Sequence, residues 1–196
     1  AELRPFWTQE GLIALYGSIV EMTASARGGD PEGVLGVYAD AVETLSQFWT
    51  EWFGGRVRLA VVAASGIAQM LPSLPAARWP ALVEAVDGLH SDGEQVVAQY
   101  EPGEWGPEGR SWTARLEAEV LRVHWLAGID APPQESLLAA WERAEQQVEA
   151  YGDVPGLAAV RTTYATIQRA TGDVAGSRVT ADKARTTAKR LGLQPL

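Results

Sequence analysis

The sequence predicts an all-α protein in which antiparallel helical hairpins stack as a right-handed solenoid of about eight helices. Apolar residues recur three and four positions apart in nearly every segment, and no segment alternates in the way of a half-buried strand. The 20 glycines and 11 prolines fall mainly between these segments. A register of small and polar residues also recurs within the C-terminal third, which is the sequence sign of stacked helical pairs.

Four helices are expected in the N-terminal half, at residues 8–26, 31–53, 56–70 and 79–100. Asp30 is placed to cap the second helix, and Pro31 suits its first position. The third helix is nearly apolar over several turns, so we expect it to be the most buried segment. The middle of the fourth helix, residues 90–93, is a candidate for a kink or a break.

The stretch 101–109, EPGEWGPEG, is the clearest loop of the chain. We expect it to separate an N-terminal helical layer, residues 1–100, from residues 110–196, where the repeat hairpins are best defined. Residues 1–196 are together long enough for one sizeable core and are taken as a single helical-repeat domain. The C-terminal helices are expected at residues 110–127, 133–151, 154–171 and 174–191.

The repeat register follows from placing Gly128 on Gly172, an offset of 44 residues. The superposed pairs are Arg115 with Ala159, Ala118 with Thr162, Arg122 with Thr166 and Trp125 with Arg169. An earlier Gly29-Asp30 turn indicates a third, decayed copy of the hairpin.

Composition sets limits on function. The chain has no cysteine, which excludes disulfides and thiolate metal sites and is compatible with a reducing cytoplasm. The longest apolar run, residues 59–71, is interrupted and shorter than the ~18 residues wanted to cross a bilayer, so no membrane contact is expected. A net charge of −9 would repel a phosphate backbone, so we expect no direct nucleic-acid binding.

The charge is unevenly spread along the chain. From Arg161 onward there are seven cationic and two acidic residues, a sum of +5, so the preceding part carries −14. One interpretation is that basic side chains suit the last turns of a C-terminal helix. The other is that this end lies against DNA or against a DNA-binding domain.

The last 85 or so residues resemble the tetratricopeptide-like segment that precedes the DNA-binding domain in large, ATP-binding LuxR-type transcriptional regulators. The features that carry the resemblance are Ala118-Glu119 with Arg122, Trp141, the turn Ala170-Thr171-Gly172-Asp173, and the closing run AKRLGLQPL at residues 188–196. Ala165, Ser177 and Ala184 match the small positions at which the two helices of a tetratricopeptide cross. An aromatic after Gly172-Asp173 and a closing proline are missing, so the prediction is tetratricopeptide-like only.

The residues that catalysis needs are not grouped in this sequence. It has no Gly-Lys-Ser or Gly-Lys-Thr phosphate loop and no His-Glu-x-x-His pair. With two histidines, His90 and His124, a multi-histidine metal site is excluded. Glu117 or Glu119 with His124 is the one acid–base pair to consider, and a lone histidine on an apolar helix is more often packed than catalytic. We therefore expect no enzyme, no cofactor and no metal.

A binding groove on the repeat hairpins is the candidate site. The first helix of each pair lines the inner groove in tetratricopeptide-like arrays, and the register then places six residues there: Arg115, Arg122, Trp125, Thr162, Thr166 and Arg169. Arginines beside an aromatic ring suit an acidic peptide or a carboxylate-bearing ligand. The alternative is a solvated helix face. Most of the eight tryptophans are expected to fill gaps between helices, with Trp105 and Trp125 as the exceptions.

Three functions remain open at this point. The leading hypothesis is a non-catalytic protein-interaction or effector-sensing domain of a cytoplasmic transcriptional regulator, whose other domains would bind nucleotide and DNA. A stand-alone scaffold that binds a peptide or a protein is the second, and a small-molecule-sensing helical domain is the third. Partners are a protein, a peptide, other domains of a longer chain or a small effector, and a homodimer is left open.

Overall fold

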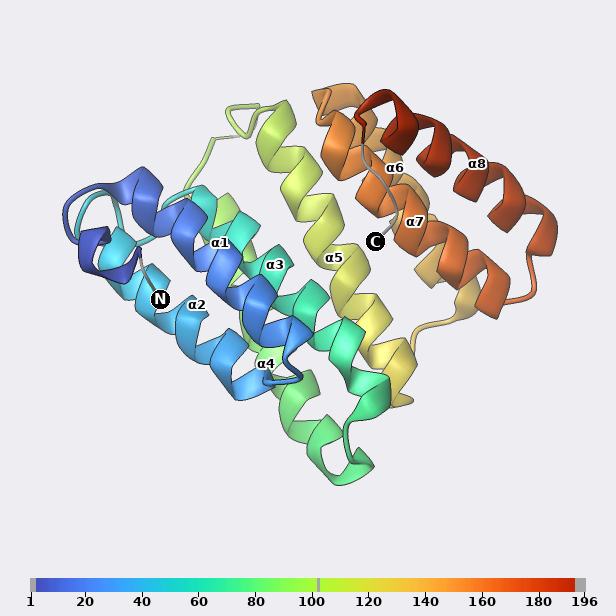
Figure 1. Cartoon of the computed structure of the whole chain (residues 1–196), viewed down its shortest axis with the longest axis horizontal. Coiled ribbons are helices and arrows are strands. Elements are labelled where there is room, and N and C mark those ends of the chain that lie inside the picture. Colours follow the sequence, from blue (N-terminus) through green and yellow to red (C-terminus); the bar gives the residue numbers. More distant parts are fainter. Residues whose placement is uncertain (1–2, 102, 193–196) are drawn as a thin grey trace.

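The computed structural model describes residues 3–101 and 103–192, and within these ranges it is all-helical, as predicted, with no strand. Eight α-helices are found in the described ranges, and Figure 1 shows them in chain order from the blue N-terminal pair to the red C-terminal pair. Their bounds are α1 Gly11–Arg27, α2 Pro31–Leu45, α3 Gly55–Met70, α4 Trp79–Val97, α5 Pro107–Ala127, α6 Gln134–Tyr151, α7 Val154–Ala170 and α8 Val174–Arg190, with short 3-10 turns at Arg4–Phe6, Leu71–Ser73 and Ala76–Arg78.

A Gly-Asp-x-x-Gly motif begins three of the helices, α2, α7 and α8. The first glycine has positive φ, at 74° for Gly29, 88° for Gly152 and 94° for Gly172, which allows the preceding helix to end and the chain to reverse. The aspartate that follows accepts a hydrogen bond from the backbone N–H three residues on, at 2.8–2.9 Å in each case. These repeated caps are the local reason for the short turns.

The third helix is the most buried, as the sequence predicts. Ten residues of α3 are buried, and α3 contacts α1, α2, α4 and α5 (Figure 1). Because neighbouring helices cover most of the surface of α3, few of its side chains need to be polar. Its side chains lie at the centre of a first hydrophobic cluster. The buried members of this cluster run in sequence from Trp7 to Val123 and include residues of each helix from α1 to α5.

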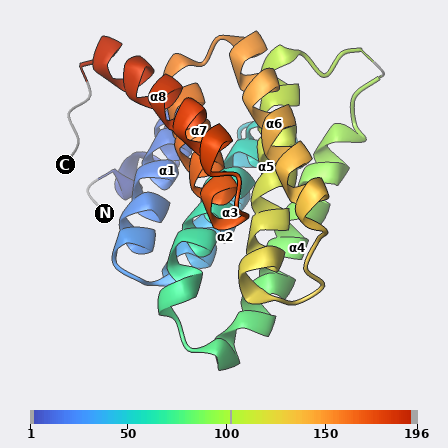
Figure 2. The ribbon, with the colours of Figure 1, turned by 90° about the vertical axis from the view of Figure 1, so that its right-hand side faces the viewer.

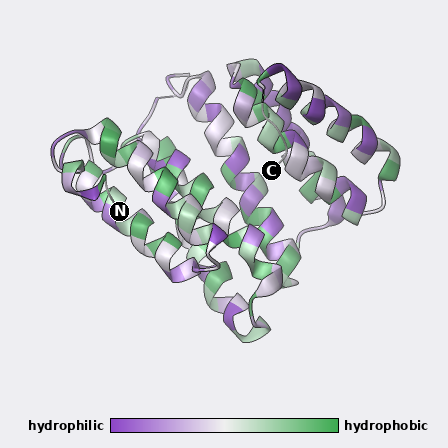
Figure 3. Ribbon diagram, viewed as in Figure 1, coloured by the Kyte–Doolittle hydropathy of each residue, from purple (hydrophilic) through white to green (hydrophobic). Residues whose placement is uncertain are grey.

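A second, smaller hydrophobic cluster lies among the C-terminal helices. It consists of Ala118, Leu137, Ala140, Trp141, Ala144, Val148, Leu157, Val160 and Ile167, from α5, α6 and α7. Figure 2 shows α5 beside α6 and α7 beside α8. Helix α8 contributes nothing to this cluster, and purple, hydrophilic residues predominate along its ribbon in Figure 3. Its four buried residues are Ser177, Thr180, Ala184 and Thr187.

Four of the predicted helix bounds are wrong by three residues or more: α1 starts at Gly11 and not at residue 8, α2 ends at Leu45 and not at residue 53, α4 ends at Val97 and not at residue 100, and α5 starts at Pro107 and not at residue 110. The second helix ends at Leu45 and not at residue 53, because the backbone N–H groups of Gln47 and Phe48 bond three residues back and the chain turns. That turn leaves Trp49 exposed and returns Phe53 to the core. The loop predicted at residues 101–109 ends three residues earlier in the structure, because Pro107 is the first residue of α5.

Helix α4 continues without a break through the candidate kink at residues 90–93. Gly93 lies where α4 crosses α5, and a Cβ atom there would lie 2.5 Å from Cδ2 of the buried Leu116. The glycine therefore serves the close approach of two helices rather than a bend. Asp92, beside it, accepts hydrogen bonds from Tyr38 of α2 and Arg56 of α3, which ties three helices together.

Candidate functional site

An open groove of about 880 Å³ lies between α7 and α8. Small side chains form most of its floor, and cationic side chains from both helices stand along it. Its α7 wall comprises Pro155, Ala158, Ala159, Thr162, Ala165, Thr166 and Arg169, and its α8 wall comprises Ser177, Ala181, Ala184, Arg185, Ala188 and Lys189. The lining includes no acidic residue. Such a surface offers apolar contact to a rod-shaped ligand and attracts negative charge.

Three of the six predicted groove residues line this cavity: Thr162, Thr166 and Arg169. The Thr162 hydroxyl donates to the Ala158 carbonyl at 2.8 Å, and the Thr166 hydroxyl donates to the Thr162 carbonyl at 3.0 Å. Both hydroxyl protons are therefore used within the helix, so the two side chains present mainly methyl groups to a ligand. Arg169 is exposed and is the cation of the α7 wall.

The other three predicted residues lie on α5, away from this groove. Trp125 packs against the second hydrophobic cluster, and Arg122 pairs with Glu119 of its own helix at 3.0 Å. Arg115 stacks on Trp112, with its guanidinium carbon 4.4 Å from the ring centroid. The six residues are therefore not gathered in one groove, because the corresponding faces of α5 and α7 have different neighbours.

Arg115 belongs to an arginine–aromatic cluster that the sequence did not suggest as a unit. Arg58 of α3 lies 5.0 Å from the Trp112 ring centroid and 5.0 Å from that of Tyr16, so Trp112 is shared by two arginines. Within the described ranges, neither guanidinium has a carboxylate at ion-pair distance. Burial lowers the pKa of Arg115, although the nearby charges of Glu119 and Asp153 oppose this effect.

A smaller pocket of about 340 Å³ adjoins this cluster. It is lined by Arg58, Glu108, Trp112, Tyr151, Gly152 and Asp153. Its charges are mixed, because Glu108 and Asp153 face the same space as Arg58. Asp153 already accepts a hydrogen bond from the Gly156 N–H as the cap of α7.

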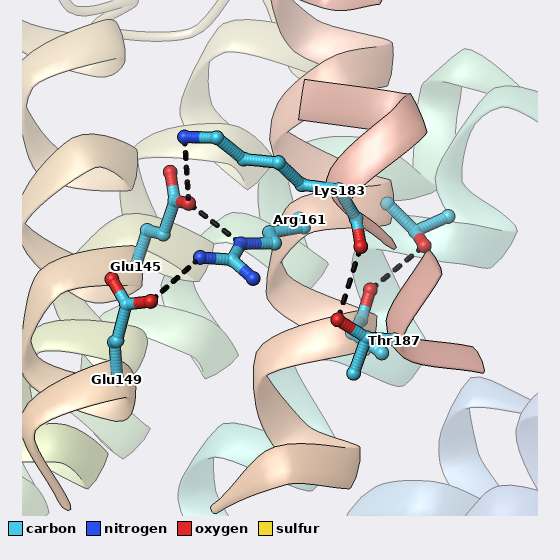
Figure 4. A network of polar contacts seen from close by, with 7 residues as sticks. Glu145, Glu149, Arg161, Lys183 and Thr187 are labelled. Atoms are coloured by element: carbon cyan, nitrogen blue, oxygen red, sulfur yellow. Dashed lines mark hydrogen bonds and ion pairs between the residues drawn. The ribbon is translucent and has the colours of Figure 1, made fainter. Parts of the chain in front are cut away.

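A partly buried ion-pair network joins α6 to α7 and α8, and the sequence did not predict it. Arg161 is 8% exposed, and its guanidinium donates to Glu145 at 2.7 Å and to Glu149 at 3.0 Å (Figure 4). Lys183 of α8 lies 3.9 Å from the same oxygen of Glu145. The carboxylates hold the pKa of Arg161 above its usual range despite burial. The groups lie opposite one another at the same level of α6 and α7, which fixes the register of the two helices.

Trp105 is the second tryptophan that the sequence predicted not to fill a gap between helices. Its ring lies 4.7 Å from that of Tyr100, centroid to centroid, and its indole N–H donates to the Thr113 hydroxyl at 2.9 Å. These contacts close the loop before α5 onto the first cluster, and they leave the ring packed rather than presented to a partner.

The residues considered for acid–base chemistry are not brought together. Glu117 pairs with Arg143 and Glu119 with Arg122. His124 instead contacts Asp87 at 2.8 Å and the Ile129 carbonyl at 2.9 Å. Burial alone would lower the pKa of His124, but these two acceptors outweigh it and raise the pKa. Among the residues described, no three acidic or histidine side chains are grouped to hold a metal ion.

Comparison of the chain with protein-family profiles, with curated proteins and with solved structures gives no match. Of the helices placed by the structure, none is long and apolar enough to cross a membrane.

Proposed function

We propose that this chain is a non-catalytic protein-interaction domain in which tetratricopeptide-like hairpins form a right-handed stack, and that its α7–α8 groove receives a helix of a partner protein. The order of helix contacts supports the stack. Consecutive helices pair as α1 with α2, α3 with α4, α5 with α6 and α7 with α8. Each later hairpin then places its first helix against the hairpin before it, through the contacts of α3 with α1 and α2, α5 with α3 and α4, and α7 with α6.

The observation that carries the proposed function is the groove itself. It has a volume of about 880 Å³, small side chains of α7 and α8 form most of its lining, and Arg169, Arg185 and Lys189 are the charged residues of that lining. Amphipathic helices dock into apolar grooves of this kind, where small residues let the two backbones approach closely. The same face is too shallow and too open to enclose a substrate away from water.

The setting we propose is a cytoplasmic transcriptional regulator, and it rests on the resemblance of the last third of the chain to LuxR-type regulators. The basic character of α7 and α8 is compatible with a position beside a DNA-binding domain. In such a protein the domain would relay the presence of a partner to the rest of the chain, because stacked hairpins repack as a unit.

Selection of helical peptides tests the proposed function. A displayed library of stapled helices is selected against the protein, and binders are retested on Ala181→Trp, which fills the groove. Glu84→Trp, on the exposed face of α4, is the matched control. We expect helical binders that lose at least tenfold in affinity on Ala181→Trp and none on the control. A selection that yields no helical binder, or only binders indifferent to Ala181→Trp, contradicts the proposal.

Sensing of a small anion is the second candidate function, and the Arg58–Trp112–Arg115 cluster favours it. Two arginines without ion-pair partners on one indole ring suit a carboxylate or a phosphate. A thermal-shift titration with acetate, succinate and inorganic phosphate tests this candidate. The shift should vanish in Arg58→Gln and persist in Arg178→Gln, an exposed control on α8. Equal shifts in the two variants would exclude the cluster as the binding site.

A further inference from the structure

The α5–α6 hairpin already shows how a groove of this type is filled. Every residue of the α7 wall has a counterpart in α5 at the offset of 44 given by Gly128 and Gly172. Thr162, Ala165 and Arg169 correspond to Ala118, Leu121 and Trp125, which all pack in or against the second cluster. The face that is covered in α5 is thus the face that is open in α7.

Helices α6 and α8 correspond at a different offset, of 40 residues. This value is the distance between the first residues of the two helices, Gln134 and Val174. It is also the distance between the positive-φ glycines that follow them, Gly152 and Gly192. The six α8 residues that line the groove then superpose on Leu137, Trp141, Ala144, Glu145, Val148 and Glu149. Four of these are buried in the second cluster, and the remaining two bind Arg161 of α7.

The comparison shows two changes in α8. The large side chains Leu137, Trp141 and Val148 of α6 correspond to Ser177, Ala181 and Ala188 in α8. The space that this leaves can be filled by large side chains of a docked helix. The charges are also reversed: Glu145 and Glu149, which hold Arg161 of α7, correspond to Arg185 and Lys189. A helix seated as α7 is seated would meet two cations where Arg161 meets two carboxylates.

We infer that the partner helix carries an aspartate or glutamate at the position that corresponds to Arg161. On α7, the large side chains that face the preceding hairpin are Leu157, Val160, Arg161, Tyr164 and Ile167, so large apolar side chains are required at the other four positions. The recognised pattern is therefore an apolar residue, a second one three positions on, the acid immediately after it, and two more apolar residues three and six positions after the acid. This inference rests on the proposed function, because it specifies the occupant of the same groove.

A second copy of this chain does not meet this requirement through the helix that would stack next. Helix α1 has an exposed apolar stripe, Leu12, Tyr16 and Val20. The eighth residue of α1, in the place that Arg161 has in α7, is Ser18, which is buried within this chain and not part of the exposed stripe, and α1 has no acidic residue before Glu21. The charge of the groove therefore favours a partner protein over self-association.

Two stapled peptides that copy residues 153–170 are the probes. One has the native sequence, and the other has Arg161→Glu as its only change. Both are titrated against the wild-type protein and against the double variant Arg185→Glu/Lys189→Glu, with Ala181→Trp as the blocked control. We expect the glutamate peptide to bind the wild-type protein about tenfold more tightly, and the order to reverse on the double variant. Added salt should shrink both differences.

The other outcomes separate the two proposals. Equal affinities for the two peptides, with binding still abolished by Ala181→Trp, overturn the charge requirement and leave the proposed function standing. If neither probe binds but the library yields groove-dependent helices without an acid at this position, the charge requirement is again overturned. If no helix binds in a groove-dependent way, both fail. A dimer in analytical ultracentrifugation that Ala181→Trp dissociates would assign the groove to a second copy and overturn the partner proposed.

Discussion

The two hydrophobic clusters are built on different principles. Around α3, ten buried and mostly apolar residues pack against neighbouring helices, and the cluster extends over five helices. Around α7, the second cluster is smaller, and its contacts are supplemented by the Arg161 network and by the Ser177 hydroxyl, which donates to the Ala165 carbonyl at 2.7 Å. Helix α8 has one apolar buried residue, Ala184.

The difference teaches that the last helix, α8, depends mainly on polar contacts for its place. Burial of apolar area contributes about 25 cal/mol per Å², whereas a single hydrogen bond contributes about 1 kcal/mol net. A helix held mainly by hydrogen bonds therefore has a lower free energy of local unfolding than the helices of the apolar core. The candidate groove is thus formed by the part of the molecule with the least apolar support, and an occupant would stabilise that part by mass action.

The largest effect is expected in the first cluster. Ile67→Ala removes three carbons from a fully buried site in α3, and we expect a loss of about 3 kcal/mol in the free energy of unfolding. Val179→Ala, on the exposed face of α8, should change it by less than about 0.5 kcal/mol. Urea unfolding followed by circular dichroism measures both. Similar losses in the two variants would remove the contrast drawn between the regions.

The next effect concerns the ion pairs of the second region. Arg161→Met leaves the partly buried Glu145 with only Lys183, at 3.9 Å, and we expect a loss of about 2 kcal/mol, less than for a fully buried pair because Glu149 is exposed. The control Arg143→Met breaks a pair whose members are both half-exposed, and should cost less than about 0.5 kcal/mol. Unfolding curves of the two variants are measured side by side. If Arg161→Met costs no more than Arg143→Met, the Arg161 network does not stabilise the fold.

Much of the fold was predictable from the sequence because its helix ends carry strong local signals. Gly29-Asp30, Gly152-Asp153 and Gly172-Asp173 mark turns by positive φ and by an aspartate cap, both of which are local. The end of α2 was missed because Trp49 and Phe53 continue the apolar period after Leu45, and periodicity does not reveal that the chain has turned.

The candidate site was predictable only in part, for a related reason. The offset of 44 identified Thr162, Thr166 and Arg169, but the second helices of the two hairpins correspond at 40 because the turn before α6 is longer than the turn before α8. A single offset therefore concealed Arg185 and Lys189. Arg58 and Trp112 were missed because their contact joins α3 to α5 across more than fifty residues of sequence.

A smaller and more local effect is expected in the last hairpin. Ser177→Ala removes the buried hydrogen bond from α8 to the Ala165 carbonyl, and we expect a cost of about 1 kcal/mol. Hydrogen exchange of the α8 amides should become faster, while that of the α3 amides changes little. Thr186→Ala, an exposed neighbour, is the control. Equal acceleration in α3 and α8 would mean that the hairpin opens only with the whole molecule.

The smallest effect is the pH dependence from His124. Because the folded-state pKa of His124 is raised above 6.5, its protonated form stabilises the fold below that pH, and the contribution is lost as the pH rises through the raised pKa. Asp87 is half-exposed, so we expect the contribution to be below about 1 kcal/mol. Asp87→Asn should flatten the fall in stability as the pH rises above 6.5. An unchanged slope would show that Asp87 does not set it.

Helix α5 is a wall common to both clusters. Leu116 belongs to the first cluster and Ala118, two residues along, to the second, so the two apolar interiors lie on opposite sides of one rigid rod. Gly93 lets α4 approach α5 closely at Leu116. Any rotation of α5 about its axis must repack both interiors at once. The two ends of the molecule are therefore mechanically joined, although each has a hydrophobic interior of its own.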